Sequence, residues 1–160
     1  MAHSEPKQAR VHVLTISDTR TLETDESGDV CARIAETAGH TVVSRIILPD
    51  DAARVLQHLQ ATVSEVDAIL INGGTGFSPR DTTFEAVSGL LDRRIDGFGE
   101  LFRMLSFAEV GSRAMASRAV AGVHGKTLIF SMPGSTKAVR LAMTKLVAPE
   151  LGHLTGELHK

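Results

Sequence analysis

The sequence predicts a single α/β domain of three layers, in which a doubly wound, mostly parallel sheet has helices on both faces. Short apolar runs alternate with segments of helical periodicity, as expected for βαβ units. The run VDAILIN at 66–72 is almost continuously apolar, which is typical of a parallel strand covered on both faces. A chain of 160 residues suits one domain. We place that domain at 11–160 and expect residues 1–10 to form a disordered tail.

The first half of the domain contains two strands and two helices. The β-rich run VHVLTIS predicts a strand at 11–17, followed by a polar loop. A helical pattern then continues to about Ala38, and Gly39 ends it. TVVSRIIL predicts a second strand at 41–48. The helix after it presents an apolar stripe formed by Val55, Leu59 and Val63.

In the middle of the chain, a glycine-rich loop and then a helix follow the strand at 66–72. Thr82 and Glu85 match a capping box, which predicts a helix from there to about Leu91. The segment 97–117 is mostly of helical pattern, and Gly111 interrupts it.

The end of the chain contains one more strand and a closing helix. KTLIFSM at 126–132 reads as a buried strand. The pattern of 138–151 predicts a helix, which we expect to break near Pro149. No repeat, low-complexity tract or long linker divides the chain.

Composition argues against several classes of function. The formal net charge is −2 and Trp and Tyr are absent, so neither a basic field nor an aromatic platform favours nucleic-acid binding. Cys31 is the single cysteine, and the seven histidines lack the spacing of a helical zinc site. The N-terminus has no apolar signal core and no later run could span a bilayer. We therefore expect a cytoplasmic protein without nucleic-acid or membrane partners.

Polar loops follow four of the predicted strands. Ligands of open α/β sheets bind at the carboxyl ends of parallel strands, beside the starts of helices. We therefore expect four loops to gather at one edge of the sheet, namely SDTR at 17–20, PDD at 49–51, GGTGFSPRDTT at 73–83 and PGST at 133–136.

The glycine loop matches neither well-known phosphate fingerprint. It has no Lys for a Walker A loop, and Pro79 stands where a dinucleotide loop needs its third glycine. The loop is either a tight turn that needs positive φ or a cradle where a ligand approaches the backbone. The neighbouring side chains favour the cradle, whose predicted binding residues are Gly73, Gly74, Thr75, Gly76, Arg80 and Asp81.

Two acids stand out among these loops. Asp81 and the pair Asp50 and Asp51 precede predicted helices, where an acid can simply complement the helix dipole. Carboxylates repel phosphates unless a cation lies between them, and Mg²⁺ is usually held by one or two carboxylates plus substrate phosphates. Asp50 and Asp81 together therefore indicate a magnesium site.

The remaining candidates are ordinary when taken singly. Ser117 and Arg118 could mark no more than a helix end with a solvated arginine, and PGST could be a simple turn. The position of PGST between a buried strand and a helix also suits an anion site. No nucleophile elbow is present, so an enzyme built this way would position two substrates and a metal rather than form a covalent intermediate.

Taken together, the loops resemble the MoaB/MogA family of molybdenum cofactor biosynthesis proteins. The matching stretches cover most of 11–151 in order, and GGTG followed by RD and GFGELFR is the most specific of them. The segments GFGELFR and SRA resemble the MoaB branch more than the MogA branch. The resemblance implies a molybdopterin-binding fold that assembles as a homotrimer, or as a hexamer made of two trimers, and that can work with other proteins of the pathway.

The resemblance also implies a reaction and a set of site residues. The reaction is adenylylation of molybdopterin by Mg-ATP, in which AMP is transferred to the terminal phosphate and pyrophosphate is released. The motif match implies that Asp50 and Asp81 are the essential acids and hold Mg²⁺. It implies substrate or nucleotide contacts for the glycine loop, Ser17, Asp18, Ser117, Gly134 and Ser135. The alternative is a non-catalytic molybdopterin-binding or carrier oligomer of the MoaB type.

Overall fold

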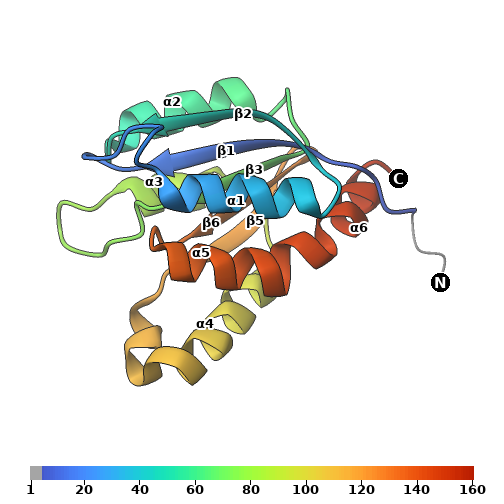
Figure 1. Ribbon diagram of the computed structural model, residues 1–160. Coiled ribbons are helices and arrows are strands. Elements are labelled where there is room, and N and C mark those ends of the chain that lie inside the picture. Colours follow the sequence, from blue (N-terminus) through green and yellow to red (C-terminus); the bar gives the residue numbers. More distant parts are fainter. Residues whose placement is uncertain (1–4) are drawn as a thin grey trace.

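A six-stranded mixed sheet forms the centre of the molecule (Figure 1). The computed structural model describes residues 5–160. The strands lie in the order β2-β1-β3-β6-β5-β4, and the first four are mutually parallel. Their bounds are Arg10–Ile16 (β1), Thr41–Leu48 (β2), Ala68–Asn72 (β3), Arg93–Arg94 (β4), Val120–His124 (β5) and Thr127–Met132 (β6).

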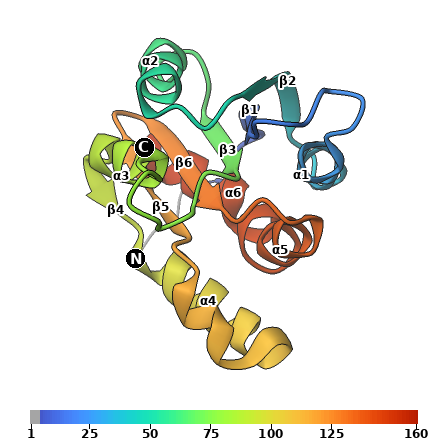
Figure 2. The same ribbon diagram turned by 90° about the vertical axis from the view of Figure 1, so that its left-hand side faces the viewer.

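Helices cover both faces of the sheet, which confirms the predicted three-layer α/β architecture (Figure 2). One face carries Glu26–Thr37 (α1), Asp96–Val110 (α4), Thr136–Ala142 (α5) and Ala148–Leu158 (α6). The other face carries Ala52–Thr62 (α2) and Thr83–Leu90 (α3). Alternation along the strands supplies both cores: Val11 and Val13 pack with the first set of helices, while Leu14 packs with the second.

The antiparallel part of the sheet was not predicted from the sequence. β5 pairs antiparallel with β6, and the two-residue β4 pairs with β5. β5 has the sequence VAGVH, which is short and contains a glycine, so its pattern is weak. Gly122 is needed there, because a Cβ at that position would lie 2.4 Å from the carbonyl oxygen of Arg93.

Two local predictions about helices were wrong. Thr82 precedes α3 but its side chain makes no capping hydrogen bond, so the predicted capping box does not form. The closing helix does not break at Pro149. Instead Met143–Val147 forms one π-helical stretch, and α6 follows it from Ala148, with Pro149 in its first turn. The π-helical stretch accommodates Pro149 within the helix, because a proline has no N–H to donate to the preceding turn.

The N-terminal segment is held from Lys7 onward, earlier than the predicted tail boundary at residue 10. The N–H of Lys7 donates to the carbonyl of Gly152, and the N–H of Ala9 donates to Nδ1 of His40. Strand β1 starts at Arg10. The remainder of the predicted tail, residues 1–4, lies outside the described residues.

A buried carboxylate ties the start of α1 to three strands. Asp25 caps α1 by accepting from the N–H of Gly28, and it accepts a 2.7 Å hydrogen bond from the hydroxyl of Thr15 on β1. Arg45 on β2 lies 3.3 Å from the same carboxylate. The side chain of Asn72, at the end of β3, donates to Thr15 and accepts from Ser27. The end of β3 is thereby fixed where the glycine loop begins.

We expect Asp25→Ala to be the most damaging polar substitution in this layer. Breaking a buried charge pair by removing one partner costs about 3–5 kcal/mol, because the other groups stay buried without their partner. Urea unfolding monitored by circular dichroism measures the loss. Asp29→Ala, on the same helix but 39% exposed, is the matched control and should cost less than about 1 kcal/mol. Equal losses in the two variants would contradict the role given to Asp25.

Two histidines form a hydrogen bond with each other between β1 and α2. Nε2 of His12 lies 2.8 Å from Nε2 of His58, and Nδ1 of His12 lies 2.6 Å from the hydroxyl of Ser44. Burial, with a smaller contribution from the charge of His58, lowers the pKa of His12 from 6.5 to about 4. Burial also lowers the pKa of His58.

This pair should make the fold weaken in mild acid. The unfolded chain protonates His12 near pH 6.5 and the folded chain only near pH 4, so stability is full above 6.5 and falls as the pH drops towards 4. The difference between the two pKa values corresponds to a loss of about 3 kcal/mol at pH 4. Unfolding free energies measured at pH 7, 5.5 and 4 test this. His12→Gln, which cannot titrate, should show a flatter pH dependence; an unchanged profile would count against the pair.

Candidate functional site

The four loops predicted to meet do meet at the carboxyl edge of the parallel strands. The N–H of Ser17 donates to the carbonyl of Leu48, which joins the ends of β1 and β2. The N–H of Gly73 donates to the carbonyl of Met132, which joins the ends of β3 and β6. The side chain of Asp18 accepts a 2.9 Å hydrogen bond from the N–H of Asp50, so the first two loops are also connected.

Glycine is required at the crossing of these loops. A Cβ on Gly73, whose φ is +90°, would lie 2.3 Å from the carbonyl oxygen of Ile16. A Cβ on Gly134 would come within 3.1 Å of Gly73 itself. Gly74 also has a positive φ, of +71°. The tight-turn interpretation of the glycine loop is therefore correct for Gly73 and Gly74, and it leaves a ligand role for the rest of the loop open.

The structure separates the two neighbouring acids at the start of α2. Asp51 is the N-cap, and its side chain accepts from the N–H of Arg54. The exposed Asp50 takes no part in the cap and instead accepts a 2.5 Å hydrogen bond from the hydroxyl of Thr83, the first residue of α3. Asp50 is therefore directed towards the loop that contains Asp81.

Asp81 packs against the glycine loop rather than capping α3. Its Oδ2 accepts from the hydroxyl of Ser78 at 2.6 Å and from the N–H of Ser78 at 3.0 Å. These hydrogen bonds, aided by the charges of Arg80 and Arg118, lower the pKa of Asp81 below its usual value and keep it ionised. A Cβ on Gly76 would lie 2.6 Å from this carboxylate, so Gly76 makes room for it.

The predicted serines fall into two groups. The hydroxyl of Ser17 accepts from the N–H groups of Thr19 and Arg20, and the hydroxyl of Ser135 accepts from the N–H of Ala138 as the N-cap of α5. Both serines shape their loops, and each O–H keeps its own proton to donate. The hydroxyl of Ser117 is different, because it is buried and has no hydrogen-bond partner among residues 5–160. A buried polar group of this kind calls for a ligand or water to satisfy it.

Ser117 lines a cavity of about 300 Å³ beside the glycine loop. Thr75 and Ser135 line the same cavity, so three of the predicted binding residues from three separate segments share one space. Arg113 and Lys137 supply positive charge to its wall, and Glu109 supplies negative charge. A cavity with hydroxyls and cations beside a glycine loop suits a phosphorylated organic ligand.

The residues present fit a magnesium ion only if the substrate supplies most of the ligands. Among residues 5–160, no three His, Cys, Asp or Glu side chains come together as a metal site. Mg²⁺ commonly uses one or two carboxylates, with phosphates and water completing its shell. Asp50 and Asp81, both at this edge and connected through Thr83 and the start of α3, match that donor set.

Arg118 is the residue of this edge whose importance the sequence did not show. Its Nε donates to the carbonyl of Thr75 at 3.3 Å, and its other nitrogens bond to the carbonyl of Gly76 and to Glu85. The guanidinium also lies 4.3 Å from the ring centre of Phe84. The solvated-arginine interpretation is therefore wrong. The only signal in the sequence was its position next to Ser117.

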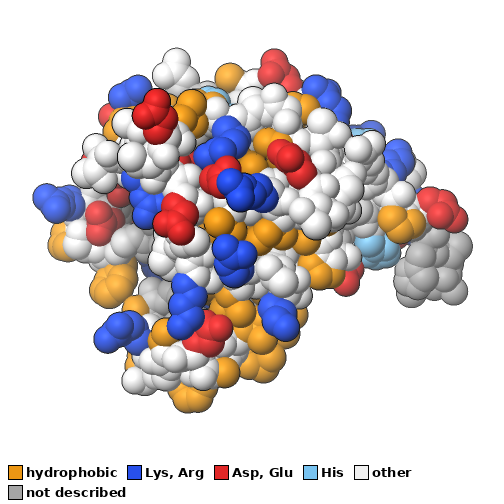
Figure 3. All heavy atoms as spheres, in the orientation of Figure 1, with side chains coloured by type: hydrophobic (Ala, Val, Ile, Leu, Met, Phe, Trp, Pro, Cys, Tyr) orange, Lys and Arg blue, Asp and Glu red, His pale blue; other side chains and the backbone are white. Residues whose placement is uncertain are grey.

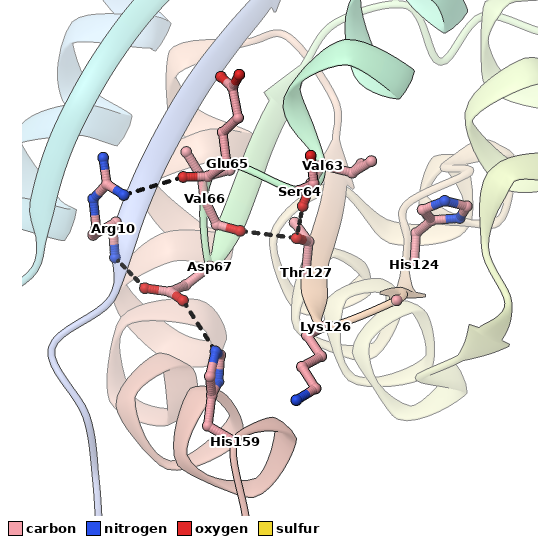
Figure 4. A pocket seen from close by; sticks show the side chains of 11 residues that line it. Arg10, Val63, Ser64, Glu65, Val66, Asp67, His124, Lys126, Thr127 and His159 are labelled. Atoms are coloured by element: carbon pink, nitrogen blue, oxygen red, sulfur yellow. Dashed lines mark hydrogen bonds and ion pairs between the residues drawn. The ribbon is translucent and has the colours of Figure 1, made fainter.

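A larger hollow of about 550 Å³ lies at the opposite edge of the sheet, where β1, β3 and β6 begin (Figure 4). Of the two acids that line it, Glu65 and Asp67, the second is already engaged, because Asp67 accepts from the N–H of Arg10 and lies 3.5 Å from His159 (Figure 4). None of the predicted site residues lines it. The carboxyl edge is the better candidate. There the hydroxyl of Ser117 has no partner among residues 5–160, and the acids Asp50 and Asp81 cap no helix.

The described helices include no candidate for a membrane span. Across residues 5–160, each helix is too short or too polar to cross a bilayer.

Comparison with known proteins gives a consistent result. Residues 12–153 match the family described as a probable molybdopterin binding domain. The molybdenum cofactor biosynthesis protein B of Bacillus cereus is 54% identical over 158 residues, which cover 97% of this chain and 94% of the relative. The Bacillus subtilis protein of the same name is 46% identical over 97% of this chain and 93% of its own length.

Solved structures agree with the sequence relatives. The crystal structure of a molybdenum cofactor biosynthesis protein B superposes with a TM-score of 0.92 at 55% identity, covering 96% of this chain and 98% of that one. The tungsten cofactor synthesizing protein MoaB from Pyrococcus furiosus superposes with a TM-score of 0.84 at 32% identity, covering 97% and 99%. The chain therefore belongs to the molybdopterin-binding-domain family, in the branch of the molybdenum cofactor biosynthesis proteins B.

Proposed function

We propose that this protein adenylylates molybdopterin with Mg-ATP. A terminal phosphate oxygen of molybdopterin attacks the α-phosphorus of ATP, and a new P–O bond forms. The bond between that phosphorus and the α,β-bridging oxygen breaks, and pyrophosphate leaves with the electron pair. The nucleophile belongs to the substrate, which is consistent with a site that offers no activated serine or cysteine; Cys31 is buried, and burial raises its pKa to about 12.

The observation that carries this proposal is the freedom of two acids from helix capping. Asp50 and Asp81 each precede a helix, yet Asp51 caps α2 and neither Asp50 nor Asp81 caps its own helix. Both therefore remain available to hold Mg²⁺, which when bound supplies neutralisation of phosphate charge. The chain's own part is to place the two substrates, because phosphoryl-type transfer depends chiefly on positioning and charge stabilisation.

The other groups at this edge have roles that follow from their positions. Ser117 supports the proposal because it lines the 300 Å³ cavity and its hydroxyl has no hydrogen-bond partner among residues 5–160. Ser135 and Thr75 line the same space and would orient the pterin phosphate. Asp18 holds the backbone of Asp50, and Arg80 adds positive charge beside Asp81.

The test of activity is a pyrophosphate-release assay with molybdopterin, ATP and Mg²⁺. The wild type should release pyrophosphate and form adenylylated molybdopterin, and Asp81→Asn should reduce kcat by about 10²-fold or more, as for loss of one charge-stabilising group. If the wild type binds molybdopterin without consuming ATP at any Mg²⁺ concentration, the carrier function holds instead. A fully active Asp81→Asn variant would exclude the metal role.

The neighbouring acids Asp50 and Asp51 give a matched pair for the same assay. Asp50→Asn should lose about 10²-fold in kcat with little change in Tm, because Asp50 caps no helix and the amide oxygen can still accept from the hydroxyl of Thr83. Asp51→Ala should keep its activity and lose about 1 kcal/mol of stability, the usual cost of a lost N-cap. If activity is instead lost in the Asp51 variant and kept in the Asp50 variant, Asp51 is the functional acid and the proposal for Asp50 is wrong.

We further propose that the chain assembles as a homotrimer or as a hexamer of two trimers, through α4 and the following 3₁₀ turn, Gly111–Ala116. Figure 3 shows hydrophobic side chains gathered over this end of the molecule. Met104 and Phe107 are each 61% exposed and Met115 is 81% exposed. Apolar surface of this extent is typical of an interface.

Charge placed on this surface should dissociate the assembly. Sedimentation at micromolar concentration should show an oligomer for the wild type and a monomer for the double variant Met104→Glu/Phe107→Glu, because burying carboxylates in an apolar contact is costly. The single variant Leu22→Glu, at an exposed leucine of another loop, is the control and should remain oligomeric. A monomeric wild type would refute self-association.

A further inference from the structure

Arg118 connects three parts of the candidate site through one guanidinium group. It bonds to two consecutive carbonyls of the glycine loop, those of Thr75 and Gly76. It pairs with Glu85 and stacks on Phe84, both on α3. Its chain neighbour Ser117 lines the cavity, and the buried hydroxyl of Ser117 has no partner in the described part of the chain. A contact set of this kind fixes the position of the loop relative to the cavity.

The backbone at Arg118 is itself held in place. Arg103 on α4 donates to the carbonyl of Ser117 at 3.3 Å and to the carbonyl of Ala119 at 3.2 Å. The two carbonyls flank Arg118, so the residue is anchored from both sides. Gly99 makes room for this contact, because a Cβ there would lie 2.7 Å from the Arg103 guanidinium.

The direction of the loop carbonyls decides the direction of its N–H groups. In a trans peptide the C=O and the N–H point in opposite directions, and no peptide bond here is cis. Since the carbonyls of Thr75 and Gly76 point at Arg118, the N–H groups of Gly76 and Phe77 point away from it. These two N–H groups have no acceptor within the described part of the chain, so they are available to an anion.

We propose that Arg118 is a positioning residue, which aims the N–H groups of Gly76 and Phe77 at the phosphates of the bound nucleotide. That assignment of the ligand rests on the proposed adenylyl transfer. Arg118 acts from behind the loop and does not itself touch substrate. The planar fork of arginine can hold two adjacent carbonyls, a carboxylate and an aromatic face at once, and the point charge of lysine cannot.

The first test measures loop order and does not depend on any activity. In the wild type, ¹⁵N relaxation should give rigid order parameters for the amides of Gly76 and Phe77, about 0.85. Arg118→Lys should lower them below about 0.6, because one ammonium cannot hold both carbonyls. Arg33→Lys, an exposed ion-paired arginine on α1, is the matched control and should leave them unchanged.

Glu85→Gln separates loop positioning from the ion pair. It removes the charge partner of Arg118 but keeps both loop carbonyls, so order at Gly76 and Phe77 should persist. Unchanged order in Arg118→Lys, or equal loss in Glu85→Gln and Arg118→Lys, would overturn the proposal.

The second test is the pyrophosphate-release assay. Arg118→Lys should lower kcat by about 10²-fold and change KM for ATP by less, as expected when donors are misdirected in the transition state. If the wild type is inactive while Arg118→Lys still lowers the order of the loop, the proposal of adenylyl transfer is wrong and the proposal of loop positioning holds. If the wild type is active and Arg118→Lys matches it in kcat, the positioning role fails alone.

Discussion

The buried carboxylate of Asp25 is the interaction on which the layout of the site depends. It caps α1, accepts from Thr15 on β1 and pairs with Arg45 on β2. The hydroxyl of Thr15 in turn accepts a hydrogen bond from the side chain of Asn72, the residue directly before Gly73. A charge in the interior is stable only when several donors surround it. The donors to this charge come from β1, β2 and α1, and Asn72 joins β3 to them through Thr15 and Ser27, so satisfying the charge also sets the relative positions of the strand ends.

The chemistry of the carboxyl edge follows from that alignment. Gly73 passes so close to Ile16 that no side chain fits, and this contact directs the chain into the loop that carries Gly76 and Asp81. Asp50 reaches Thr83 at the start of α3 from the adjacent loop. Acids, backbone N–H groups and hydroxyls therefore converge although they are far apart in the sequence. The scaffold supplies rigidity and the loops supply the polar groups, as is usual for α/β proteins.

The two faces of the sheet and its two edges carry different features. The face that bears α4 leaves apolar side chains exposed around Met104 and Phe107, which suits assembly. The face that bears α2 encloses the paired His12 and His58, from which we predict that the fold weakens in acid. At the edge where β1, β3 and β6 begin, Asp67 and Thr127 are engaged in hydrogen bonds within the protein. At the carboxyl edge, the hydroxyl of Ser117 has no hydrogen-bond partner among residues 5–160.

The sequence by itself determined the fold class, the parallel strands and the four loops, because strand and helix periodicity and loop composition are local properties. The role of the acids Asp50 and Asp81, which the sequence also indicates, stays a prediction. The sequence did not show β4, β5 or the failure of the Thr82 cap, because a short strand and a cap depend on what packs beside them. Only the tertiary structure decided that Asp51 rather than Asp50 caps α2, that the buried hydroxyl of Ser117 has no partner within residues 5–160, and that Arg118 bonds to the glycine loop. Each of these facts concerns a hydrogen bond made or left unmade across the fold, and such bonds depend on distances that no local pattern contains.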